Sequence, residues 1–201
     1  LTSLRKFYTE DAGYALAKQV DTSLIQLGRG FSGGDGTNVY DEALIGSDGT
    51  TKYVAGSANE AALTDAAIRR TIQRLDDNDV PMEGRFFIIP PSARNTLMGL
   101  NRYTEQAFVG EVGSSNTIRN GEIGNLYGMP VFVSSNADTT SGAARVALMG
   151  HKDAAVLVEQ VGIRSQTQYK QEYLGTLYTA DTLFGVKELR DGSAFALAVP
   201  A

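Results

Sequence analysis

Few side chains in this sequence can perform chemistry at neutral pH. The 201 residues include no cysteine and one histidine, His151. A thiolate nucleophile, a Cys-ligated metal and any site with two imidazoles are therefore excluded. A Ser–His–Asp triad would have to use His151, and no G-x-S-x-G elbow presents a serine to it. We expect His151 to lie in a turn, hydrogen-bonded to backbone. A small metal-independent hydrolase using His151 remains the alternative from the enzyme class.

A second motif with chemical potential is the glycine pattern at residues 28–33, which formally matches G-x-G-x-x-G. Dinucleotide binding needs a strand before this motif and a helix after it, so that the helix N-terminus meets the pyrophosphate. The pattern here follows a predicted helix, and more glycines follow it. We interpret the segment as a flexible loop and predict no cofactor and no metal.

The overall composition describes an ordinary soluble globular chain, with 42% hydrophobic residues, 20% charged residues and a net charge of −5. A dedicated nucleic-acid site normally needs a basic patch, so sequence-specific DNA binding is not expected. No apolar run approaches the roughly 18 residues of a membrane span. With 22 glycines, the chain should contain many tight turns.

Helical periodicity appears in three places. An apolar stripe at steps of three and four predicts a long helix over 1–28. A second helix has a buried face made by Leu63, Ala67, Ile68, Thr71, Ile72 and Leu75. Its N-cap is either Ser57, through a capping box with Glu60, or Thr64. A short helix over 92–100 follows the pair Pro90-Pro91.

Strand patterns occupy most of the remainder. A hairpin is predicted at 43–54, around Asp48-Gly49. Apolar runs predict strands at 84–89, 129–134, 145–149, 154–158, 183–189 and 194–199. Residues 163–173 alternate, with one wholly polar face, which predicts a long strand with one solvated or partner-facing side. This order of elements indicates an α+β fold with mixed sheets.

Four segments in this order resemble the major capsid proteins of tailed bacteriophages, and short-tailed phage coat proteins in particular. They are residues 63–91, the glycine-rich turn and strand at 120–136 with its Ser135-Asn136 exit, residues 150–155 and residues 183–190. The resemblance implies a long spine helix, an elongated peripheral β-sheet domain and a mixed α/β axial domain. It places residues 1–28 and 156–182 in the peripheral domain, 29–56 in a glycine-rich loop and hairpin, and 57–155 with 183–201 in the axial domain.

The resemblance also implies where copies of the chain would meet. The capsomer-centre loop would carry Tyr103, Phe108, Arg119 and Glu122. The contact strand of the peripheral domain would carry Arg164, Gln166, Gln168, Lys170 and Glu172. The family has an N-terminal arm and an extended loop before the spine helix, and both are missing from a sequence that starts at Leu1. We therefore expect these 201 residues to be part of a longer product.

The prediction is a major capsid protein that self-assembles through pentamers and hexamers into an icosahedral shell around phage double-stranded DNA. It would be located in the virion after assembly in the bacterial cytoplasm, without catalysis and without a membrane. Scaffolding, portal and decoration proteins are the partners that the resemblance implies. An encapsulin-like nanocompartment shell is the alternative within the same fold.

Overall fold

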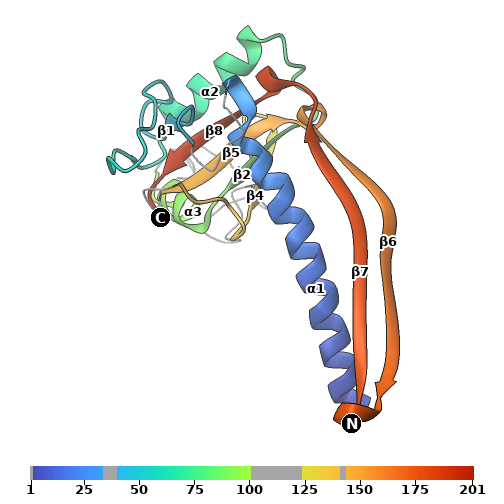
Figure 1. The fold of residues 1–201 in the computed structure, drawn as a ribbon. Helices are drawn as coiled ribbons and strands as arrows, with labels where there is room; N and C mark the ends of the chain where they lie inside the picture. Colours follow the sequence, from blue (N-terminus) through green and yellow to red (C-terminus); the bar gives the residue numbers. More distant parts are fainter. Residues whose placement is uncertain (1, 34–39, 101–123, 141–143) are drawn as a thin grey trace, which may run out of the picture.

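The computed structural model describes residues 2–33, 40–100, 124–140 and 144–201, and these form two regions of different shape (Figure 1). One region, the arm, consists of helix α1 (Thr2–Gln26) and the hairpin of β6 (Ala155–Lys170) and β7 (Gly175–Glu188). The other, the body, is a six-stranded sheet with two helices. The N-terminus lies at the far end of the arm, beside the turn of the hairpin, and the C-terminus lies in the body.

The body sheet has the strand order β1-β8-β5-β2-β4-β3. Its members are β1 (Leu44–Ile45), β2 (Arg85–Ile89), β3 (Asn125–Leu126), β4 (Met129–Val133), β5 (Arg145–His151) and β8 (Ala194–Val199). β1 runs parallel to β8 and β2 runs parallel to β4, whereas the other neighbours are antiparallel. This mixed sheet and the helices packed on it confirm the expected α+β class.

The central strands β5 and β8 are buried on both faces, which explains their almost continuous apolar sequences. One face carries large side chains, among them Met149, Leu197 and Val199, in a core shared with helices α2 (Asp65–Asp77) and α3 (Pro91–Met98). The other face of β8 carries only alanines: Ala194, Ala196 and Ala198. Other backbone can therefore approach this second face closely.

The predicted buried face of α2 is confirmed, because Leu63, Ala67, Ile68, Thr71 and Leu75 have at most 1% of their surface exposed, and Ile72 packs partly buried against them. The N-cap is Thr64, whose Oγ1 accepts a hydrogen bond from the Ala67 N–H at 3.3 Å. The capping box at Ser57 is wrong, because residues 57–64 precede the helix in irregular structure.

The small hairpin predicted around Asp48-Gly49 is present. Leu44 bridges Lys52 in antiparallel register, and Gly49 has a φ of +62°. The Asp48 carboxylate accepts hydrogen bonds from the Thr51 hydroxyl and from the backbone N–H groups of Thr50 and Thr51, and these bonds hold the pKa of this carboxyl below its usual range. The parallel pairing of β1 with β8 was not foreseen.

The hairpin of the arm differs from the predicted strands. Segments expected separately at 154–158 and 163–173 form one strand, β6, which ends at Lys170. Residues Gln171–Tyr173 make a 3₁₀ turn, and Leu174 follows it with a left-handed φ of +47°. β7 then continues to Glu188, so residues 183–188 pair with β6 and not with the body sheet. The strand pairing shifts register between Glu159 and Val161 and again between Val161 and Arg164.

Helix α1 confirms the predicted long helix, but its apolar stripe is only partly covered. Leu16, Val20 and Leu24 are half-buried and Ile25 is buried, whereas Tyr8 is 62% exposed. Leu16 and Val20 line a shallow apolar groove with Leu157, Ile163 and Phe184 of the hairpin. None of the helices in the described ranges is long and apolar enough to span a bilayer.

Thr64→Ala should lower the free energy of unfolding by about 1 kcal/mol, because it removes the hydrogen bond that caps α2. Ser57→Ala is the matched control and should change the unfolding free energy by no more than about 0.5 kcal/mol, the range of a surface substitution. Urea denaturation of both variants measures the difference. Equal losses would contradict the assignment of Thr64 as the cap.

Candidate functional site

The structure places His151 at the end of β5 with 4% of its surface exposed. Its Nε2 lies 2.8 Å from the Glu83 carbonyl oxygen, and its Nδ1 accepts from the Asp153 N–H at 3.2 Å. Both ring nitrogens are therefore occupied by backbone, with the proton on Nε2. This is the turn histidine that the sequence indicated. Among the described residues, no three His, Cys, Asp or Glu side chains are grouped to hold a metal ion.

The glycine motif at 28–33 is closely packed, and the prediction of a flexible loop is wrong for this segment. We call residues 27–33 the root: two 3₁₀ turns, Leu27–Arg29 and Phe31–Gly33, that join α1 to the body. A Cβ on Gly28 would lie 3.3 Å from Leu148, and one on Gly30 would lie 2.6 Å from Glu188 Oε2. A side chain at either position would require Leu148 or Glu188 to move, so the two glycines allow this close packing.

The root packs on the alanine face of the body sheet. Phe31 is 4% exposed and contacts Leu148, Ala154 and Ala194. Ser32 has a left-handed φ of +60°, and its hydroxyl donates to the Ala194 carbonyl oxygen at 2.7 Å. Small residues on the sheet and glycines on the root therefore bring two backbones together.

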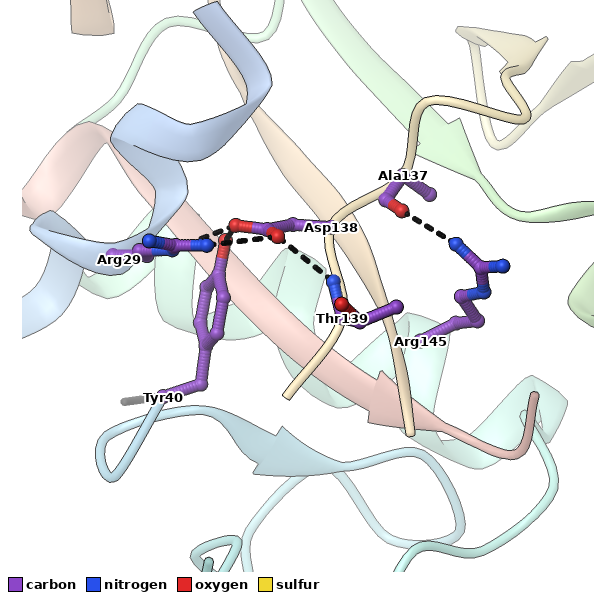
Figure 2. A network of polar contacts seen from close by, with 6 residues as sticks. All are labelled: Arg29, Tyr40, Ala137, Asp138, Thr139 and Arg145. Carbon is purple, nitrogen blue, oxygen red and sulfur yellow. Dashed lines mark hydrogen bonds and ion pairs between the residues drawn. The ribbon is translucent and has the colours of Figure 1, made fainter. Parts of the chain in front are cut away.

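Between the two glycines, Arg29 forms the central polar contact of the root (Figure 2). Its Nε and Nη2 donate to the two carboxylate oxygens of Asp138, at 2.7 and 2.9 Å. The Tyr40 hydroxyl donates to Asp138 at 2.8 Å, and the Thr139 N–H donates at 2.8 Å. The Arg29 and Asp138 side chains are only 16% and 7% exposed. This contact is a buried, bidentate ion pair with its remaining acceptor positions filled.

The pKa shifts in this cluster favour a charged Arg29 and a neutral Tyr40. The hydrogen bond to Asp138 raises the pKa of Arg29 despite partial burial. Burial raises the pKa of Tyr40, and the negative charge of Asp138 raises it further. Tyr40 is therefore a neutral donor, and its ring also lies 5.6 Å from the Arg29 guanidinium carbon.

A second polar contact joins α1 to the body, farther along the helix. Asn136 Nδ2 donates to Asp21 Oδ2 at 2.6 Å, and Ser134 Oγ lies 3.5 Å from the same oxygen. Ser134, Asn136 and Asp138 belong to residues 134–138, which follow β4 and which we call the strap. The strap therefore contacts α1 through Asp21 and the root through Arg29.

Sequence reasoning missed the roles of all the side chains in these two contacts: Arg29, Tyr40 and Asp138 in the first, and Asp21, Ser134 and Asn136 in the second. Arg29 is 109 residues from Asp138, and Asp21 is 115 residues from Asn136. The one local signal was an arginine enclosed by two glycines. The Ser135-Asn136 strand exit was noted only as part of a family pattern, and nothing in it indicated α1 as the partner.

The predicted contact residues of the hairpin are solvent-exposed or nearly so. Arg164, Gln166, Gln168 and Lys170 lie on β6, whereas Glu172 lies in the following 3₁₀ turn and not on the strand. Arg164 pairs across the hairpin with Asp181 at 2.7 Å. The predicted capsomer-centre residues Tyr103, Phe108, Arg119 and Glu122 lie outside the residues that the structure describes.

Apolar exposure is concentrated on the arm. Of the eighteen large hydrophobic side chains that are exposed among the described residues, eleven belong to α1, the hairpin or its turn. Tyr173 and Leu174 in the turn are the most exposed, at 82% and 83%. Ile25, at the body end of α1, is the one buried apolar side chain of the arm among those described. Such surface is typical of subunits that are covered by partners.

Comparison with known proteins identifies the class. Solved structures of phage capsids share this fold across nearly the whole chain. The structure from Mycobacterium phage Che8 has a TM-score of 0.69 at 21% identity, over 94% of this chain and 61% of that one. The capsid of cyanophage P-SCSP1u has a TM-score of 0.68 at 20% identity, over 97% and 65%. The chain thus spans less than two thirds of the length of either structure.

The family is shown by sequence. A family model described as "Phage capsid protein" matches residues 8–196, and the chain belongs to that family. It is therefore a structural protein and not an enzyme. No curated protein sequence matches it. A solved encapsulin, the holo-SrpI complex from Synechococcus elongatus PCC 7942, has the same fold with a TM-score of 0.55 at 16% identity, over 96% of this chain and 64% of that one.

Asp138→Ala should lower the free energy of unfolding by about 2–4 kcal/mol, because it leaves Arg29 partly buried without its counter-charge and Tyr40 without an acceptor. Asp181→Ala is the matched control, because it breaks the exposed pair with Arg164 and should cost about 0.5 kcal/mol. Denaturant unfolding of dissociated subunits measures both. Equal losses would show that the root pair contributes no more than a surface ion pair.

Proposed function

We propose that this protein self-assembles through pentamers and hexamers into an icosahedral shell that encloses phage double-stranded DNA. Membership of the phage capsid protein family and the fold shared with phage capsid structures support a shell subunit. We further propose that the shell is built in the host cytoplasm with scaffolding, portal and decoration proteins, and that it forms the virion capsid.

The observation that carries this proposal is that the arm has no core of its own. A two-stranded hairpin is marginally stable by itself in water. Helix α1 covers part of it and leaves a groove between them lined by Leu16, Leu157 and Phe184. Among the described residues, eleven of the eighteen exposed large apolar side chains lie on this arm and seven lie elsewhere. Contact with neighbouring copies would remove that surface from water and stabilise the arm.

We assign α1 and the complete β6–β7 hairpin to the peripheral part of the subunit and the body to the axial part. This assignment moves the proposed boundary from residue 182 to 188, because β7 is continuous to Glu188. The root, the strap and the segment around Tyr40 would then join the two parts.

The charge of the chain supports enclosure of DNA without sequence-specific binding. With a net charge of −5, a shell lined by this chain would not hold each turn of DNA through counterion release. Purified particles should therefore contain DNA of mixed sequence. Electron microscopy and light scattering of the full-length protein test the assembly itself. A protein that stays strictly monomeric at high concentration would overturn the proposal.

Removing the apolar side chains at the hairpin turn should weaken self-association without destabilising the fold. In Tyr173→Ser/Leu174→Asn, two side chains that are more than 80% exposed are replaced by polar ones, and asparagine tolerates the left-handed φ of residue 174 better than leucine. Light scattering measures assembly, and urea unfolding measures stability. Met82→Ser, at a 72% exposed position of the body, is the control. Unchanged assembly of the double variant would exclude the turn from the contact.

Adding like charges to the polar face of β6 should weaken association in a salt-dependent way. Gln166→Glu/Gln168→Glu gives every copy two extra negative charges on the proposed contact strand. Assembly should fall at low ionic strength and recover toward 1 M salt, where the screening length is about 3 Å. Gln73→Glu/Asn95→Asp adds the same charge to exposed positions on the body helices. An identical salt response of the two variants would contradict a contact at this strand.

An encapsulin-like compartment is the second candidate, favoured by the fold shared with the SrpI encapsulin complex. The contents of purified particles separate the two functions. Nuclease-protected DNA supports the capsid. Particles that enclose a protein cargo and no DNA support the compartment.

A further inference from the structure

The strap makes two polar contacts with α1 and the root that follows it, and these contacts differ in strength. The inner contact, Arg29 with Asp138, is a bidentate ion pair whose side chains are 16% and 7% exposed. Around it, Phe31 is buried, and Gly28 and Gly30 lie close to Leu148 and Glu188. This end of the helix is fixed, because moving it would break several buried contacts at once.

The outer contact, Asp21 with Asn136 and Ser134, is weaker in kind. It joins one carboxylate to neutral donors, and all three residues are partly exposed. Within the strap, the Asn136 N–H donates to Ser134 Oγ at 3.1 Å. This hydrogen bond holds the Ser134 and Asn136 side chains on the same side of the strap, where both reach Asp21. A partly exposed neutral–charged hydrogen bond can be exchanged for water at low cost.

A small displacement at the outer contact produces a larger displacement at the far end of the arm. At about 1.5 Å per residue, Asp21 lies roughly 12 Å from Arg29 along the helix, and Thr2 lies about 40 Å from it. A displacement of about 1 Å at Asp21, with the root held fixed, therefore moves the far end of α1 by roughly 3 Å. Both strands of the hairpin contact α1, and the hairpin would therefore move with the helix.

We propose that the outer contact sets the angle between arm and body, and that this angle sets the curvature at which copies of the chain pack. The first half concerns the single subunit. The second half rests on the proposed shell function. Asp21 and Asn136 are positioning residues in this scheme, because they act through the orientation of the arm and not through direct contact with a neighbour.

The angle can be measured by placing two spin labels in one chain. The sequence has no native cysteine, so Thr176→Cys near the arm tip and Asn95→Cys on α3 provide unique attachment points, both exposed. Diluting labelled chains with excess unlabelled protein restricts pulsed dipolar measurements to distances within one chain, whatever the assembly state. Asn136→Asp in this background places a carboxylate opposite Asp21 and should open the outer contact.

The expected result is a broader distance distribution for Asn136→Asp, with its mean shifted by roughly 3 Å or more. Asp21→Asn/Asn136→Asp exchanges donor and acceptor and should restore the original distribution. Asp11→Asn removes a carboxylate from an exposed position of the same helix and should change nothing. An unchanged distribution in Asn136→Asp, or a failure of the exchanged pair to restore it, would overturn the proposal for the subunit.

Particle diameter tests the second half independently. If the full-length protein assembles, Asn136→Asp should give particles of altered or mixed diameter in electron micrographs, and the exchanged pair should return a uniform diameter. A changed angle with unchanged diameter would overturn the link to curvature and leave the angle-setting role supported. Absence of particles from the wild-type protein would contradict the proposed function and not the distance result.

Discussion

The ion pair between Arg29 and Asp138 is the interaction on which the rest of the architecture depends. It joins residues 109 apart in the chain, at the root that follows α1, and is the more buried of the two polar contacts between this segment and the strap. A buried pair is costly to desolvate, and it is favourable here because both carboxylate oxygens are fully bonded. The close packing of the root on the alanine face of β8 surrounds this pair: Phe31 is buried there, and the Ser32 hydroxyl donates to the Ala194 carbonyl oxygen.

The two regions of the molecule obtain their stability in different ways. The body has a core of large side chains between one face of its sheet and helices α2 and α3. The arm has exposed apolar surface, a shallow groove and long strands, and it depends on the root at one end. The body therefore has the larger buried core, whereas much of the apolar surface of the arm is exposed in the single chain.

Sequence patterns predicted helix α1 and the elements of the body well and the hairpin poorly, for a physical reason. These body elements are buried against neighbours, so α2 and β2 have periodic apolar residues and β5 and β8 have nearly continuous apolar runs. The hairpin is exposed on much of its surface, and its turn uses Leu174 where a glycine or asparagine would have marked the reversal. Both polar contacts of the strap join side chains more than 100 residues apart, which no local pattern can indicate.

The direction of the two strands has a mechanical consequence. Both β6 and β7 run the full distance between the body and the turn, and their pairing is antiparallel. A force that pulls the turn away from the body is therefore shared by two covalent backbones and does not shear the hydrogen bonds between them. Such a force acts along both strands and is transmitted to the two places where the hairpin joins the body, at Ala155 and Glu188.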